Sequence, residues 1–118
     1  MGFKNTIVRD PKFVAVEVTG LAFVEDAEPL LKALEAETRL HGDKRLLINL
    51  LDVVGTFAGA QQELLGKLAS RHLAHLEKVA SLVPKGKITR VSERSAQIRG
   101  LHLMVFTSLA EAVEWLTA

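Results

Sequence analysis

Two histidines in the second half of the chain have a spacing that metal ligands use. His72 and His75 lie three residues apart in a stretch that we expect to be helical, so both imidazoles can point the same way. A competent site needs a third ligand, and Glu63 lies more than two helical turns away. We therefore predict no metal site. His72 falls in the apolar arc of the helix, which favours a core or helix-end histidine. The alternative is a polar group that lines a cavity and orients the head group of a ligand.

A second candidate is the carboxylate at the end of an apolar run. Residues 46–51 read LLINLL, and Asp52 ends the run. Such a run predicts a strand buried on both faces, and ligands of open α/β sheets bind beyond the carboxyl ends of the strands. Asp52 can accept a hydrogen bond from a ligand there, or it can cap its own loop. Thr56 and Phe57 follow in that loop, and Phe57 is either core or a lip over a pocket. The candidate ligand-binding residues are therefore Asp52, Thr56, Phe57 and His72.

These candidates lack the partners that catalysis requires. No second carboxylate, serine or histidine is arranged to form an acid–base or nucleophile–base pair with Asp52. The loop 55–59 leads into a helix N-terminus, which favours anions, but it lacks the glycine spacing of dinucleotide sites and the Gly-Lys-Ser/Thr of phosphate loops. The absence of cysteine excludes disulfides and thiol catalysis. We predict a protein that is not an enzyme and uses no cofactor.

The segment 85–99 is basic. It contains five cationic residues against one acid, Glu93. If the segment is helical, Lys87, Arg90 and Arg94 share one arc beside an apolar arc, an arrangement suited to an anionic membrane surface or another anion. The alternative is a solvated helix face packed on a sheet. The segment has no aromatic residue for base stacking and the net charge of the chain is only +1, so we expect no binding of nucleic acid.

The length and composition are those of one globular domain covering residues 1–118. Apolar residues make up 48% of the chain and charged residues 25%, which is typical of a folded protein. The longest apolar run falls far short of the roughly 20 residues that a membrane span needs. The N-terminus, MGFKNTIVRD, lacks the apolar segment of a secretory signal. We therefore expect a cytoplasmic protein, with peripheral membrane contact as the alternative.

The hydropathy pattern predicts the order β-β-α-β-α-β-α-β-α. The expected hairpin covers residues 6–19 around Asp10-Pro11, because proline biases its neighbour away from helix. The further strands are expected at 46–52, 78–83 and 101–107, and the helices at 26–39, 60–76, 87–99 and from Ser108, which opens a capping box. Strands joined through helices should run parallel with right-handed crossovers. The fold class is α/β, with a mixed, mostly parallel sheet flanked by helices.

Three segments in this order resemble the STAS domain, and more closely the SpoIIAA-like family, also called STAS/SEC14-type. They are KRLLINLLDVVG (44–55), HLEKVASLVP (75–84) and VFTSLAEAVEWL (105–116). The resemblance covers the whole chain and implies a single bacterial STAS-like domain. Anti-sigma factor antagonists of this fold carry a phosphorylated serine at the start of the helix after the central strand. Residues 60–63, AQQE, stand in that place, and there is no serine between Leu50 and Ala69.

The resemblance therefore implies a binding role without a phosphoserine switch. The SpoIIAA-like branch is thought to bind apolar or lipid-like ligands, and the resemblance implies membrane association as a further expectation. We expect a non-enzymatic domain that binds an apolar or lipid-like small ligand. The alternative is a regulatory protein-interaction module related to the anti-sigma factor antagonists, with a protein partner and no ligand. A homodimer through a sheet edge or an apolar helix face is a further alternative.

Overall fold

Five strands form one sheet in the order in which they occur in the chain. The computed structural model describes residues 3–118. The strands are β1 (Lys4–Arg9), β2 (Val14–Leu21), β3 (Arg45–Val54), β4 (Lys78–Leu82) and β5 (Leu103–Phe106). The strand β1 pairs with β2 antiparallel, and every later pair is parallel. The predicted hairpin, the parallel sheet and the α/β class are confirmed.

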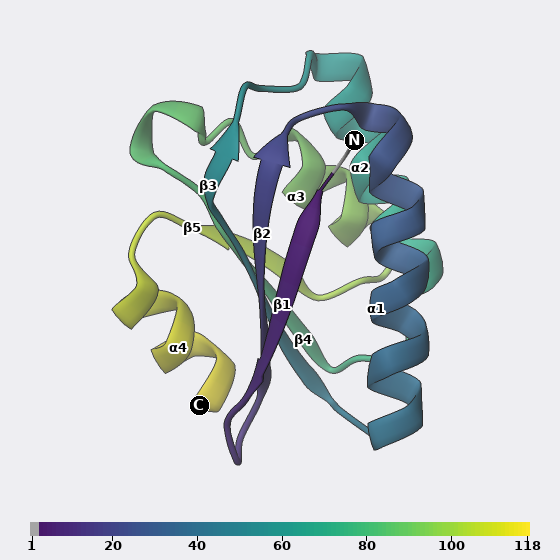
Figure 1. Ribbon diagram of the computed structural model, residues 1–118, viewed down its shortest axis with the longest axis vertical. Coiled ribbons are helices and arrows are strands. Elements are labelled where there is room, and N and C mark those ends of the chain that lie inside the picture. The colour runs from purple at the N-terminus through teal and green to yellow at the C-terminus, as the bar shows by residue number, and fades with distance from the viewer. Residues whose placement is uncertain (1–2) are drawn as a thin grey trace.

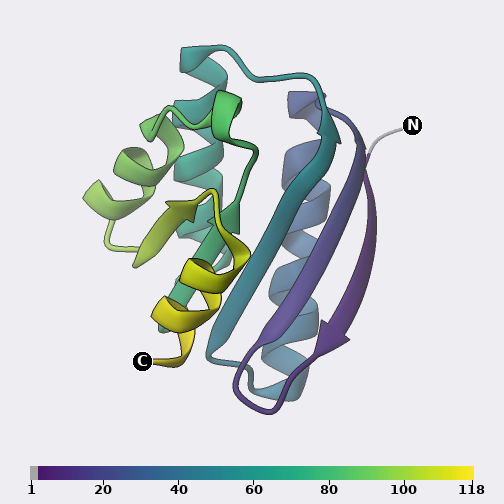
Figure 2. The same cartoon turned by 90° about the vertical axis from the view of Figure 1, so that its left-hand side faces the viewer.

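The sequential strand order decides where the helices lie. They are α1 (Ala27–His41), α2 (Gly59–His72), α3 (Val91–Ile98) and α4 (Leu109–Thr117), with short 3-10 turns η1 (Val24–Asp26) and η2 (Lys85–Lys87). Right-handed crossovers between successive neighbouring strands all return on the same side of a sheet. Accordingly α1, α2 and α3 cover one face, and α4 alone lies on the other (Figures 1 and 2).

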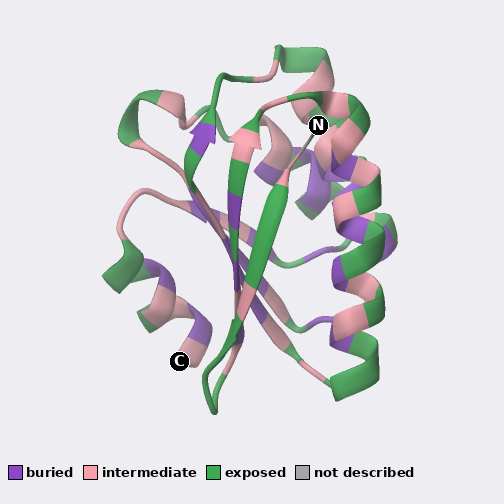
Figure 3. Cartoon of the chain, in the orientation of Figure 1, coloured by how far each residue is buried: buried purple, intermediate pink, exposed green. Residues whose placement is uncertain are grey.

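Two apolar cores result, one on each face. The larger contains inward residues of the strands together with α1, α2 and α3, among them Val16, Leu34 and Leu73. The smaller joins α4 to β3 and β4 through Leu47, Ala80, Leu82, Ala112 and Leu116. Figure 3 shows the buried residues gathered in the middle of the sheet, whereas β1 is mostly exposed.

The central strand β3 is buried on both faces only in its first half. Leu47 packs under α4, and Ile48 packs under α1 and α2. Beyond this point α4 no longer covers the strand, so the side chain of Leu51 is 41% exposed. The strand also continues past Asp52, which pairs with Thr19 of β2. The predicted end of the strand at Asp52 is therefore wrong by two residues.

Two predicted helices are too long. In the structure α2 ends at His72 rather than at residue 76. Leu73 and Leu76 pack into the core from the turn that follows the helix, so the apolar spacing in the sequence continues beyond the helix end. The predicted helix 87–99 begins only at Val91. Ile88 reaches the core from an extended segment, and Arg90 has a left-handed backbone with φ of 62°.

The helix α3 closes the outer edge of β5. Glu93 is 7% exposed and its Oε2 accepts a hydrogen bond of 2.6 Å from the Val105 N–H, while Gln97 Nε2 donates to the Leu103 carbonyl at 2.8 Å. These side chains satisfy backbone groups that another strand would otherwise bind.

The helices α2 and α3 touch at Gly66, where a Cβ would lie 2.5 Å from the Ser92 carbonyl oxygen. Only glycine fits this contact.

Candidate functional site

Two pockets open beside the carboxyl ends of β3 and β4. The first, the strand-end pocket, lies between the loop after β3, the start of α2 and the segment from η2 to α3. The second, the interhelical pocket, lies between α1 and α2 above the sheet. Each has a volume of about 120 Å³. The first is where the rule for open α/β sheets places ligands.

The two pockets adjoin each other, and together we call them the joined cavity. Five residues line both of them: Leu50, Phe57, Leu65, Ser81 and Ser92. Apart from the two serines, the interhelical pocket is lined by apolar side chains and Gly66. The strand-end pocket adds the polar side chains of Thr56, Gln62, Lys87, Thr89 and Arg90. The cavity is therefore apolar at one end and polar at the other.

Hydrogen bonds hold the wall of the strand-end pocket. Lys87 Nζ donates to the Val53 carbonyl at 2.7 Å, and Gln62 Nε2 donates to the Phe57 carbonyl at 2.9 Å. Thr89 Oγ1 donates to Gln62 Oε1. These contacts tie the loop 55–57 to α2 and to the segment before α3. The chain segments around the pocket mouth are thereby fixed to one another.

The structure brings two of the four predicted ligand-binding residues to this cavity. Thr56 lines the strand-end pocket, and Phe57 lines both pockets. Asp52 is exposed within β3 and lines neither, because its side chain points away from the helices that form the cavity. His72 also lines neither, since it lies at the opposite end of α2. The four predicted ligand-binding residues therefore do not line one pocket.

His72 instead bridges two helices as an ion-pair centre. Its Nδ1 donates to Glu35 Oε1 at 2.9 Å and its Nε2 donates to Glu28 Oε2 at 3.1 Å, although the residue is only 7% exposed. Donation from both nitrogens requires the imidazolium. The hydrogen bonds with Glu35 and then Glu28 raise the pKa of His72, and the bond with His72 lowers the pKa of each glutamate. Both ring nitrogens of His72 therefore have a partner, because α1 supplies two carboxylates.

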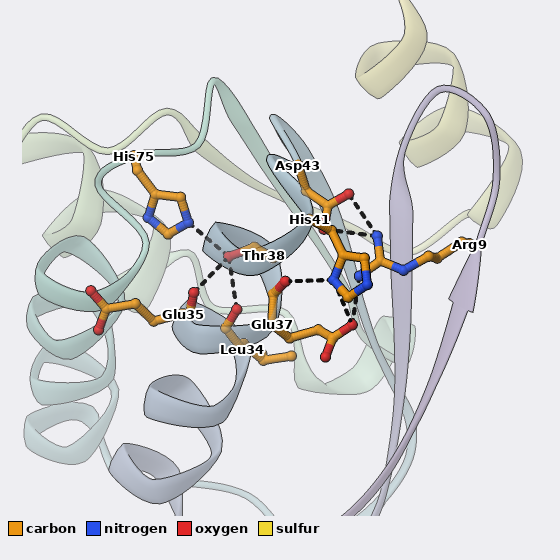
Figure 4. Close-up of polar contacts among 8 residues, drawn as sticks. All are labelled: Arg9, Leu34, Glu35, Glu37, Thr38, His41, Asp43 and His75. Carbon is orange, nitrogen blue, oxygen red and sulfur yellow. Dashed lines mark hydrogen bonds and ion pairs between the residues drawn. The ribbon is translucent and has the colours of Figure 1, made fainter.

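His75 occupies a different, neutral environment. Thr38 Oγ1 donates to the Leu34 carbonyl at 2.7 Å and accepts from His75 Nε2 at 2.7 Å (Figure 4). His75 Nδ1 is buried and has no partner among residues 3–118. Burial, followed by the nearby Arg39 charge, lowers the pKa of His75. The tautomer with a proton on Nε2 accounts for the bond to Thr38 and for the unpartnered Nδ1.

The same end of α1 is joined to β1 through Arg9, which forms ion pairs with Asp43 and Glu37 (Figure 4).

The predicted basic stripe is dispersed. Lys87 ends η2 and points to Val53, whereas Arg90 precedes α3 and bonds Glu93 Oε1 and Oε2 at 3.0 and 2.9 Å. Arg94 is exposed on α3. Because the first two are not helical, the three cations do not form one helical arc. Lys87 and Arg90 line the strand-end pocket instead.

Sequence reasoning missed the two serines at the centre of the cavity. Ser81 is 8% exposed and is the one hydroxyl residue of β4, whose sequence is KVASL. Ser92 lies at the start of α3. A single hydroxyl in a buried strand is a usable signal, because a buried polar group normally requires a partner. Ser92 carried no comparable signal, since serine is common near helix starts.

The part of the chain that the structure describes contains no cluster of three or more metal-ligating side chains. Among these same residues, no helix combines the length and the hydropathy of a transmembrane segment.

Comparisons with known proteins agree on the fold. A family model described as SpoIIAA-like matches residues 13–117. The chain is similar to the crystal structure of an uncharacterised protein of the DUF3478 family with a SpoIIAA-like fold from Shewanella loihica PV-4. That match has 22% identity and a TM-score of 0.61, and it covers 98% of this chain and 94% of that one.

A second solved structure has a named activity. It is an anti-sigma factor antagonist from Mycobacterium paratuberculosis, with 14% identity, a TM-score of 0.66 and coverage of 99% of this chain and 96% of that one. At these identities both structures show the fold alone. No curated protein matches the chain.

Proposed function

Because this chain belongs to the SpoIIAA-like family, we propose that it is a non-catalytic regulatory module that binds a protein partner at the carboxyl ends of its strands. The observation that carries the proposal is a group of exposed apolar side chains there, which we call the strand-end patch. It consists of Leu21, Phe23 and Val54, which are 51%, 44% and 60% exposed.

Backbone pairing between β2 and β3 brings residues of the strand-end patch together. Leu21 and Val54 are register partners on β2 and β3, and the Ala22 N–H donates to the Val54 carbonyl at 2.9 Å. Contiguous exposed apolar groups on a monomer are a feature of interaction sites. The solved antagonist of the same fold supports this reading, since its name denotes a protein that acts on another protein.

The proposed module differs from a phosphorylated antagonist. There is no serine between residues 50 and 69, and Thr56 supplies the single hydroxyl in that interval. The first turn of α2 instead presents the small exposed residues Gly59 and Ala60. Control of partner binding by a serine phosphate at this position is therefore excluded from the proposal.

Surface substitutions test the protein-binding proposal. The double variant Leu21→Ser, Val54→Ser removes apolar area from the patch, whereas Leu40→Ser, Ile98→Ser removes it from exposed positions elsewhere (80% and 76% exposed). Proteins cross-linked to the tagged chain in its native cells are identified by mass spectrometry. We expect one reproducible partner that the patch variant loses at least tenfold and the control variant retains. Equal retention by both variants would contradict the proposal.

The joined cavity favours a second candidate function, the binding of a small apolar ligand. Each pocket, at about 120 Å³, is close in size to the roughly 150 Å³ engineered cavity that accepts benzene. The predicted ligand is therefore one ring or a short chain at each end of the cavity, rather than a two-chain lipid. Thr56 and Phe57 remain the proposed contact residues, and Asp52 and His72 have no place in this cavity.

Membrane contact through the basic segment stays a prediction, as does a cytoplasmic location. Arg90 and Arg94 are both exposed, but Arg90 is paired with Glu93 and Lys87 is partly buried in the wall of the strand-end pocket. Of the three predicted cations, Arg94 is therefore the one that is exposed and lies outside both pockets. Flotation of the native protein with vesicles of anionic phospholipid tests the contact, and an absence of binding would remove it.

A further inference from the structure

We propose that the joined cavity binds a medium-chain monocarboxylate, with the carboxylate near Lys87 and the Ser81 and Ser92 hydroxyls and the hydrocarbon chain in the interhelical pocket. This inference rests on the second candidate function, the binding of a small ligand. It adds the chemical class of that ligand and its direction in the cavity.

Ser81 supplies the first argument. Ser81 is 8% exposed and Ser92 is partly buried. Among residues 3–118 neither hydroxyl is a fully enclosed group without a partner, so both remain accessible from the pockets. Both serines line both pockets. Two accessible hydroxyls where the pockets adjoin can donate hydrogen bonds to a ligand with one polar group.

The charge of the cavity supplies the second argument. No aspartate or glutamate among the described residues lines either pocket, whereas Lys87 and Arg90 line the strand-end pocket. Arg90 is neutralised by its bonds to Glu93. Lys87 Nζ bonds only the neutral Val53 carbonyl, so two of its three donors and its full charge remain for a ligand. The polar end of the cavity therefore complements a single anion.

The other end of the cavity fixes the orientation. The interhelical pocket is walled by apolar side chains of α1, α2 and the sheet, including Leu30, Leu34 and Ile48. An ionised group there would lose its hydration without compensation. The carboxylate must therefore lie toward Lys87, and the chain must run past Phe57 and Leu65, which line both pockets.

Calorimetric titration of the full chain tests this inference with four probes: octanoate, octanol, octylamine and acetate. We expect octanoate to bind at least tenfold more tightly than octanol or octylamine, and acetate to show no binding. Shortening octanoate to hexanoate should weaken binding by roughly fourfold for each methylene removed. Equal binding of octanol and octanoate would overturn the carboxylate inference but leave the ligand-binding function intact. Failure of all four probes to bind would overturn both.

Variants locate the head group. Lys87→Gln should reduce octanoate binding to the level of octanol and leave octanol binding unchanged, whereas Lys85→Gln, an exposed lysine outside both pockets, should change neither. Ser81→Ala should weaken octanoate binding at least threefold while the melting temperature of the free protein stays the same or rises, because the variant removes only a hydroxyl group. If Ser81→Ala leaves octanoate binding unchanged, or if Lys85→Gln weakens it as much as Lys87→Gln does, the assigned position of the carboxylate is wrong.

Discussion

At the scale of single residues, the two histidines show how partners decide chemistry. His72 and His75 lie three residues apart near the end of α2, yet one is a cation between two carboxylates and the other is a neutral donor to Thr38. Their spacing was visible in the sequence. Their partners were not, because Glu28, Glu35 and Thr38 come from α1, more than thirty residues earlier. Long-range pairing of polar groups has no local signal.

The His72 ion pair should make stability depend on pH in a defined direction. The pKa of His72 is raised on folding, so its contribution is present below the unfolded value of roughly 6.5 and is lost as the pH rises through the folded value. The lowered pKa of Glu28 and Glu35 keeps both carboxylates charged in mildly acidic solution. We expect His72→Gln to lower the free energy of unfolding by about 1 kcal/mol near pH 5.5, with a smaller loss above pH 8.

Urea denaturation of the native protein and the variant between pH 5 and 9 measures this difference. His41→Gln is the matched control, because His41 pairs with Glu37 at an exposed position where solvent screens the ion pair. A loss that is the same for His72→Gln at every pH would show that the histidine acts through packing instead.

At the scale of elements, the boundaries were harder to predict than the elements themselves. Every predicted strand and helix is present, but α2 is shorter and α3 begins four residues late. In both places apolar residues next to the helix, such as Leu76 and Ile88, pack into the same core from a turn or an extended segment. The apolar period therefore continues beyond the helix. Tertiary contacts, rather than local propensity, set these ends.

The contact between α2 and α3 leads to a prediction at Gly66. An added Cβ would lie 2.5 Å from the Ser92 carbonyl oxygen and 2.6 Å from Ser95 Cβ. Gly66→Ala should gain about 1 kcal/mol of helix propensity and lose more by overpacking, with a net loss of roughly 1–2 kcal/mol in the free energy of unfolding. In Gly59→Ala the new Cβ meets nothing within 4 Å, so this control should be neutral or slightly stabilising. Thermal unfolding followed by circular dichroism compares the two, and a stabilised Gly66→Ala would refute the close contact.

At the scale of the whole molecule, the class and the element order were predictable because hydropathy period and chain order carry them. The strand order was not, since parallel strands joined by helices can be arranged in several ways. The observed order places three helices on one face and leaves α4 alone on the other. The candidate site was likewise predictable only in part. The loop with Thr56 and Phe57 was predictable from the end of a strand, whereas Ser81 and Ser92 meet there only after folding.

The two cores share one sheet, so we expect them to unfold together. Trp115 is the single tryptophan of the chain, which has no tyrosine, and it packs in the smaller core against Phe106. Leu34→Ala, in the larger core on the opposite face, should cost about 2–5 kcal/mol. The Trp115 fluorescence midpoint in urea should fall together with the midpoint from far-ultraviolet circular dichroism. Leu116→Ala, in the smaller core, should move both probes in the same way. A tryptophan transition that stays unchanged in Leu34→Ala would show that α4 unfolds separately.

The sequential strand order also bears on synthesis of the chain. Each strand from β2 to β5 pairs with the strand that was translated immediately before it. No strand has to wait for a partner encoded further downstream, and no strand has to insert between two that are already paired. The sheet can therefore grow at one edge as the chain leaves the ribosome, with one crossover helix between additions. The last strand to be added is β5, and α3, which precedes it, supplies the side chains that end the growth.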